Sequence, residues 1–127
     1  MIVQDLVAEL GLQVHSAGNV EREVSGGYAS DLLSCVMAGA RAGNIWITLQ
    51  AHPNVVAVAS LLDLAAVIVS EGVMPDAETV ERAQENGVTV LSSGASTYAL
   101  VARLAALGIP PGEESQWPAG PRGGGGT

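Results

Sequence analysis

The chain has 127 residues, and among them there is no lysine, no phenylalanine and a single cysteine. Five arginines face thirteen acidic residues, which gives a formal net charge of -8. The arginines are scattered along the chain, whereas binding to nucleic-acid phosphates or to an anionic membrane surface needs clustered cations. We therefore expect neither nucleic acid nor a membrane among the partners of this protein.

Cysteine and histidine are too few for a disulfide framework or a metal centre. Cys35 is alone, which is typical of a protein from a reducing compartment. His15 and His52 are the two histidines, and neither stands in a cluster with the spacing of metal ligands. The first residues also lack the basic start of a secretory signal. These features predict a cytoplasmic protein without a metal or another cofactor.

Familiar catalytic motifs are missing as well. The chain contains no P-loop, no G-x-S-x-G, no H-E-x-x-H and no G-x-G-x-x-G after a predicted strand. His52 has no obvious nucleophile paired with it, and a histidine at a strand-to-helix junction more often bonds to the backbone than acts as a base. We therefore expect no enzyme activity, and kinase activity least of all, because the chain has neither a P-loop nor a lysine.

Short runs rich in β-branched residues alternate with helical patterns along most of the chain. The runs at residues 45–49, 65–69 and 88–91 are typical of strands buried on both faces of a sheet. Two further strands are predicted at residues 12–16 and 20–28, the second with a bulge or a close backbone approach at Gly26 and Gly27. Helices are predicted at residues 3–10, 32–43, 53–62, 76–86 and 97–107.

This order predicts an α/β fold, a small and mostly parallel sheet with flanking helices in a single layered domain. Ser30, Asp76 and Ser96 stand where N-caps are expected. The longest apolar stretch, residues 55–69, is shorter than the ~20 residues of a membrane span and contains Ser60 and Asp63. It therefore predicts a helix followed by a buried strand.

The composition changes at Pro110. Of residues 110–127, ten are glycine or proline, and the hydrophobic ones are Trp117 and Ala119. Such a segment buries too little apolar surface to offset its chain entropy. We predict a domain over residues 1–109 and a disordered tail over residues 110–127. Trp117 is either exposed in that tail or docked on the domain or on a partner.

The candidate binding site lies where the predicted parallel strands end. Ligands of open parallel sheets sit beyond the carboxyl ends of the strands, where helix N-termini offer free N–H groups. The loops there gather small polar side chains, which can equally serve as helix caps and turns. The candidate ligand-binding residues are Gln50, His52, Asn54, Ser70, Ser92, Ser93, Ser96 and Thr97.

Four other polar side chains have ordinary structural interpretations. Asp31 is expected in the first turn of a helix, Asp63 at a helix end and Glu71 in solvent, because none of these acids has a paired partner in the sequence. Cys35 lies beside apolar helix positions and is expected to be a partly buried, inert thiol.

These segments resemble the DRTGG domain family. The resemblance lies in residues 44–59, 66–72 and 90–98, and in the upstream glycine-rich strand and helix at residues 24–32. At the places of the family's Asp-Arg pair and Thr-Gly-Gly stretch, this chain has Ala51-His52 or His52-Pro53, and Ser70-Glu71-Gly72. The resemblance implies a regulatory or dimerising unit like those beside CBS-domain pyrophosphatases and phosphotransacetylases. It extends to the amino-terminal domain of HPr kinase/phosphorylase, which carries no catalytic loop.

Two functions compete on these grounds. The first is a non-catalytic regulatory module that forms a homodimer and senses a nucleotide or a phosphorylated metabolite at the strand ends. The second is a scaffold or adaptor that binds a partner protein and no small molecule. Under the first function, the ligand must be held mainly by backbone N–H groups and small hydroxyls, because the chain offers no lysine and no phenylalanine.

Overall fold

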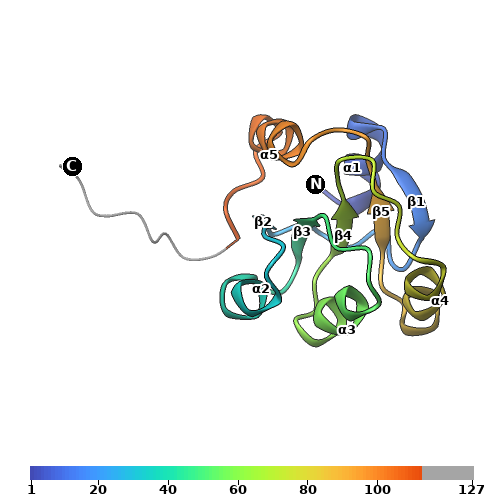
Figure 1. Cartoon of the computed structure of the whole chain (residues 1–127). Coiled ribbons are helices and arrows are strands. Elements are labelled where there is room, and N and C mark those ends of the chain that lie inside the picture. The colour runs from blue at the N-terminus through green and yellow to red at the C-terminus, as the bar shows by residue number, and fades with distance from the viewer. Residues whose placement is uncertain (113–127) are drawn as a thin grey trace.

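The computed structural model describes residues 1–112, in which helices cover both faces of a central sheet (Figure 1). In chain order the elements are α1 (Val3–Leu10), β1 (Gln13–Ser16), β2 (Gly26–Ala29), α2 (Leu33–Gly39), β3 (Asn44–Thr48), α3 (Asn54–Leu61), β4 (Ala66–Val69), α4 (Ala77–Asn86), β5 (Val90–Ser92) and α5 (Thr97–Ala106). No helix among these residues is long and apolar enough to cross a membrane.

The sheet is mixed, with four parallel strands and one antiparallel edge. Its strand order is β1-β5-β4-β3-β2. β2, β3, β4 and β5 run parallel to their neighbours, while β1 pairs antiparallel with β5. The prediction of a small, mostly parallel sheet with flanking helices is therefore confirmed, and the helical crossovers place the carboxyl ends of the parallel strands at one edge.

Alternate residues of the central strands pack into two separate hydrophobic cores, one on each face of the sheet. Helices α2, α3 and α4 cover one face of the sheet, and α1 and α5 cover the other (Figure 1). Trp46 of β3 packs in the cluster on the first face, and its neighbours Ile45 and Ile47 pack in the cluster on the second. All five residues of β3 and all four of β4 are buried. This double burial explains why β4 is a continuous apolar run in the sequence and why the apolar centre of β3, residues 45–47, is unbroken.

The predicted strand at residues 20–28 is wrong over most of its length, because β2 begins only at Gly26. The preceding segment pairs with the start of the chain instead. Glu23 forms an isolated antiparallel bridge with Ile2, and the Val24 N–H donates to the Met1 carbonyl oxygen at 3.0 Å. Val20 and Val24 pack against the core on the α1 face, which accounts for their apolar character without a strand.

The predicted helix caps are confirmed in part. The Ser96 hydroxyl accepts a hydrogen bond from the Ala99 N–H at 3.0 Å, as an N-cap does. Asp76 occupies the N-cap position of α4, but its side chain makes no capping bond. Ser30 lies before the N-cap of α2, which is Leu32. Cys35 on α2 is exposed rather than partly buried.

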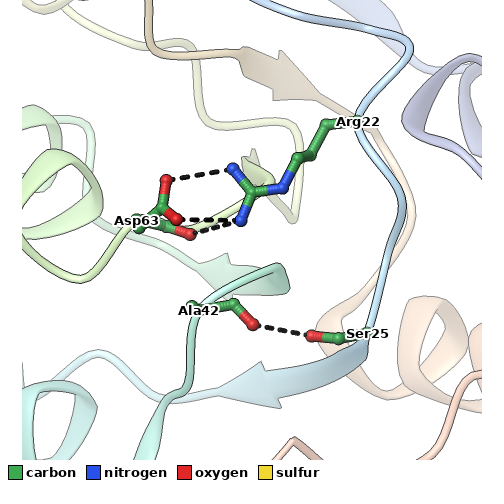
Figure 2. Close-up of polar contacts among 4 residues, drawn as sticks. All are labelled: Arg22, Ser25, Ala42 and Asp63. Carbon is green, nitrogen blue, oxygen red and sulfur yellow. Dashed lines mark hydrogen bonds and ion pairs between the residues drawn. The ribbon is translucent and has the colours of Figure 1, made fainter.

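A salt bridge ties the segment before β2 to the turn before β4, at the amino ends of the parallel strands. The guanidinium of Arg22 donates to both carboxylate oxygens of Asp63 at 3.0 Å and to its carbonyl oxygen at 3.2 Å (Figure 2). Hydrogen bonding from Arg22 lowers the pKa of Asp63. Nearby, the Ser25 hydroxyl donates to the Ala42 carbonyl oxygen (Figure 2). Asp63 does end a helix as predicted, and it also has this partner.

The described chain ends beside the edge strand β2. Pro111 forms a parallel bridge with Gly27, whose N–H donates to the Pro110 carbonyl and whose carbonyl accepts from the Gly112 N–H. A Cβ on Gly26 would lie 2.8 Å from the Cα of Gly112. The close backbone approach predicted at these glycines is therefore present. Residues 113–127, with Trp117 and most of the predicted tail, lie outside the described residues.

Candidate functional site

The carboxyl ends of the four parallel strands form a rim that holds all eight candidate residues. Strand pairing places the end of β3 beside that of β4, and the end of β4 beside that of β5. The structure divides the eight residues into two groups. One group follows β3, and the other joins the loops after β4 and β5.

The group after β3 consists of Gln50, His52 and Asn54, and it is engaged with the neighbouring backbone. The Gln50 side-chain amide donates to the Asp31 carbonyl oxygen at 2.8 Å. The exposed His52 accepts from the Asn54 N–H at its Nδ1, 3.2 Å away. His52 thus bonds to the backbone, as expected for a histidine at a strand-to-helix junction.

Asp31 belongs to this part of the rim, and its expected role in a helix first turn is wrong. It precedes α2, and one carboxylate oxygen accepts from the Thr48 hydroxyl at 2.9 Å and from the Leu49 N–H at 2.7 Å. Asp31 thereby fastens the end of β3 to the loop after β2. The bond is non-local, so nothing in the local pattern around Asp31 indicates it.

The second group links the loops after β4 and β5. The hydroxyls of Ser70 and Thr97 lie 2.7 Å apart, and Ser70 is fully buried. The Ser93 hydroxyl accepts from the Ala95 N–H at 3.0 Å, and the Ser93 carbonyl accepts from the Gly72 N–H at 3.0 Å. The two loops are thus joined by a side-chain bond and a backbone bond, and together they form one continuous part of the rim.

Glu71 caps α5 and is not simply solvated, as the sequence led us to expect. Its carboxylate accepts from the Thr97 N–H at 2.9 Å, at the first residue of the helix. Its backbone has a φ of 63°, in the left-handed region that glycine favours. A carboxylate at a helix N-terminus neutralises the partial positive charge there. This N-terminus therefore already has an anionic partner from the chain itself.

His15 is a rim residue that sequence reasoning did not select. Its Nε2 lies 2.7 Å from the Ser92 hydroxyl, on the neighbouring strand β5. Burial lowers the pKa of the His15 imidazole, which favours the neutral form. The register of β1 against β5 skips His15 between Val14 and Ser16. The alternation of apolar and polar residues predicts a strand at β1, but the contact between His15 and Ser92 depends on the antiparallel pairing of β1 with β5.

A hollow of about 300 Å³ opens beside these loops. We call it the rim hollow. Its lining combines glycines, hydroxyls, one amide and one thioether, and consists of Gly11, Gln13, Gly72, Met74, Ser92, Ser93 and Gly94. Of the eight candidate residues, Ser92 and Ser93 line it. The other six do not, and they are Gln50, His52, Asn54, Ser70, Ser96 and Thr97.

The rim hollow has no cationic lining. Within residues 1–112, Arg22 pairs with Asp63, Arg82 pairs with Glu78, and Arg41 donates to carbonyls at the end of α2. Arg103, in the last turn of α5, donates to the Glu9 carbonyl oxygen. The same part of the chain contains no group of three side chains suited to a metal ion. The rim hollow therefore offers a ligand hydroxyls, backbone groups, the Gln13 amide and the Met74 thioether.

Comparison with known families assigns this architecture. Residues 6–107 match the model of the DRTGG domain. The chain belongs to the DRTGG domain family. The match includes both loops of the second rim group and β1, which supplies His15. A comparison with curated proteins finds no match.

A solved structure shares the fold of this DRTGG domain. It is described as the CBS and DRTGG domains of the regulatory region of Clostridium perfringens pyrophosphatase, complexed with the activator diadenosine tetraphosphate. The TM-score is 0.65 at 15% sequence identity, over 91% of this chain and 51% of that one. The present chain thus spans about half of that regulatory region.

Proposed function

We propose that this DRTGG domain is a non-catalytic regulatory module that binds a nucleotide or a phosphorylated metabolite in the rim hollow. The observation that carries the proposal is the hollow itself, at the strand ends where open parallel sheets bind ligands. The related fold in a pyrophosphatase regulatory region that was complexed with a nucleotide activator supports a regulatory role. The absence of lysine and of a P-loop from the sequence argues against phosphoryl transfer.

The lining of the rim hollow suits the neutral parts of a nucleotide. Ser93 accepts a hydrogen bond at its oxygen, so its own proton is available to a ligand acceptor. Gln13 is exposed and offers an amide donor and acceptor, and Met74 presents 53% of its surface to solvent. A thioether packs well against a flat ring. We expect the base and sugar to supply more of the binding energy than the phosphates.

The first experiment compares ligands by thermal shift and by amide NMR shifts. The probes are ATP, adenosine, diadenosine tetraphosphate and inorganic phosphate. A ligand that binds the folded state raises the melting temperature with its concentration. We expect the nucleotides to do so and to shift the amide signals of Gly72, Ser93 and Gly94. A flat response to all four probes would instead favour a scaffold that binds a protein partner.

A blocking variant makes this experiment specific to the rim hollow. Gly94 lines the hollow and a Cβ on it would meet no atom within 4 Å, so Gly94→Leu adds a bulky side chain there without a clash at its Cβ. Ala102→Leu adds the same side chain at an exposed position of α5 outside the hollow. We expect Gly94→Leu to abolish the thermal shift and Ala102→Leu to keep it. Equal shifts in both variants would place the ligand elsewhere.

We also propose that the domain self-associates. Leu32 and Leu49 are 61% and 41% exposed. Their backbones lie close together, because the carboxylate of Asp31, the residue before Leu32, accepts a hydrogen bond from the Leu49 N–H. Two exposed leucines gathered at one place favour contact with a second copy of the chain.

Sedimentation velocity at micromolar concentrations tests this second proposal. We expect a dimer for the native chain and a monomer for Leu32→Ser combined with Leu49→Ser. Leu61→Ser is the matched control, because Leu61 is 69% exposed and ends α3, away from the rim. A native chain that sediments only as a monomer would remove the proposal.

A further inference from the structure

A second hollow, of about 310 Å³, lies beside the edge strand β2 on the α5 side of the sheet. We call it the edge hollow. The side chains that line it are apolar, because the hydroxyl of Tyr28 donates to the Cys35 carbonyl oxygen of α2 on the other face of the sheet. The lining consists of Gly27, Tyr28, Ala29, Ile47, Val101, Leu104, Ala105, Ile109, Pro110 and Pro111. No charged side chain contributes to it, so its chemistry fits an apolar or aromatic occupant.

One wall of the edge hollow is the segment that leads into the last part of the chain. Ile109, Pro110 and Pro111 line it, and the bonds of Pro110 and Gly112 to Gly27 hold this wall against β2. The described chain therefore ends at Gly112, next to this wall. Among residues 113–127, Trp117 is the one aromatic residue.

We propose that the edge hollow is the docking site for the indole of Trp117 from the same chain. Trp117 is the fifth residue after Gly112, and an extended chain spans at most about 3.6 Å per residue, so the indole can reach roughly 18 Å from Gly112. That reach covers a hollow whose wall ends at Pro111. The proposal is independent of the rim hollow and of self-association.

Covalent attachment favours this occupant over a second copy of the chain. A group tethered by a short linker has an effective concentration in the millimolar range, far above a micromolar concentration of partner chains. A tryptophan also has the largest apolar surface to remove from water among the residues after Gly112. When docked, Trp117 covers the apolar wall next to β2, so exposure of this wall depends on the tail.

Fluorine NMR of the full chain labelled with 5-fluorotryptophan tests the proposal. The chain gives one signal each for Trp46 and Trp117, and Trp117→Phe assigns them. A soluble gadolinium chelate then reports the solvent exposure of each indole. We expect several-fold less relaxation enhancement for Trp117 than for the same residue in a synthetic peptide of residues 110–127. Equal enhancement in chain and peptide would overturn the proposal.

Two exposed alanines of α5 provide a matched pair. Ala105 lines the edge hollow and Ala102 does not. We expect Ala105→Glu to raise the enhancement at Trp117 to the peptide value and Ala102→Glu to leave it low. Ala29→Gln, at a lining position on β2, is expected to act like Ala105→Glu. Because Trp46 is fully buried, its unchanged signal shows that each variant is folded.

Two further outcomes would also contradict the proposal. Continued protection of Trp117 in both Ala105→Glu and Ala29→Gln would mean that the indole docks somewhere else. Protection that disappears on dilution of the native chain would mean that the indole enters a second copy.

Discussion

Acidic side chains near the rim act as acceptors for particular N–H groups. Asp31 accepts from Leu49, and Glu71 accepts from Thr97, although both acids are exposed. Each bond joins two loops that are distant in sequence. A single carboxylate therefore fixes the position of one loop relative to another in each case. A hydrogen bond to a charged group is stronger than one between neutral groups, whereas exposed ion pairs usually contribute little.

Glu71 affects stability both through its carboxylate at the α5 N-terminus and through its left-handed backbone, and a substitution can remove the first effect alone. Glu71→Gln keeps the left-handed backbone strain but removes the charge that faces the α5 N-terminus. We expect a loss of about 0.3–1 kcal/mol in the free energy of unfolding, the usual worth of an acid at a helix start. Urea denaturation measures it, with the exposed Glu81→Gln in mid-α4 as control. An equal effect of both variants would show that Glu71 is not a cap.

At His15 the lowered pKa makes stability depend on pH. In the unfolded chain the His15 imidazole binds a proton near pH 6.5, whereas in the folded chain it binds one only at lower pH. The free energy of unfolding therefore falls as the pH drops from about 6.5 through the pKa of His15 in the folded chain. His15→Gln keeps a nitrogen near the Ser92 hydroxyl but cannot titrate. We expect its unfolding free energy to fall less than that of the native chain between pH 7 and pH 5.

Urea denaturation at several pH values checks this expectation. His52→Gln is the control for removing a histidine from an exposed position. Parallel pH profiles for the native chain and His15→Gln would rule out a contribution from the His15 imidazole.

At the scale of elements, the glycines of the edge strand β2 allow residues 110–112 to approach its backbone closely. Gly26 is buried, and its closeness to the Gly112 Cα leaves no space for a side chain. This contact lets residues 110–112 lie along β2 and form one wall of the edge hollow. An edge strand covered in this way is less open to pairing with other chains.

Gly26→Ala should push residues 110–112 away from β2. We expect it to lower the free energy of unfolding by about 1–3 kcal/mol, as overpacking does, and to reduce hydrogen-exchange protection of the Gly27 N–H, which donates to Pro110. Gly94→Ala is the control, because its Cβ meets nothing within 4 Å. If deletion of residues 110–127 left the cost of Gly26→Ala unchanged, the clash with Gly112 would not be its cause.

At the scale of the molecule, one sheet separates two apolar clusters. Trp46, Val67 and Val69 face α2, α3 and α4, whereas Ile45 and Ile68 face α1 and α5. Neighbouring residues of the same strands belong to different clusters. Loss of either cluster therefore removes the support of the strands on which the other is built, and the two should unfold together.

Leu6→Ala tests this coupling, because Leu6 is fully buried in the cluster that Trp46 does not join. We expect a loss of about 2–5 kcal/mol, typical of a leucine truncated in a core. The denaturation midpoint of Trp46 fluorescence, measured in a Trp117→Phe background, should shift together with the midpoint of helical circular dichroism. Separate midpoints would show that the two faces unfold independently.

The sequence predicted the elements that depend on local patterns. Helix α1 and the helices α3, α4 and α5 lie where periodicity and capping residues indicated, within a residue or two of the predicted ends. Strands β3 and β4 were recognisable as short runs rich in β-branched residues, and burial on both faces gives β4 its unbroken apolar run. The family resemblance found from the same segments is confirmed by the match over residues 6–107.

Only the tertiary structure decided which polar side chains meet. The sequence grouped eight rim residues by their place after strands, but only Ser92 and Ser93 among them line the rim hollow, and the candidate site stays a prediction. His15 reaches Ser92 through an antiparallel pairing between residues 77 positions apart. Asp31, Glu71 and residues 110–112 likewise find partners across long sequence separations. Local patterns report burial and backbone preference, whereas these contacts depend on how the elements are packed in space.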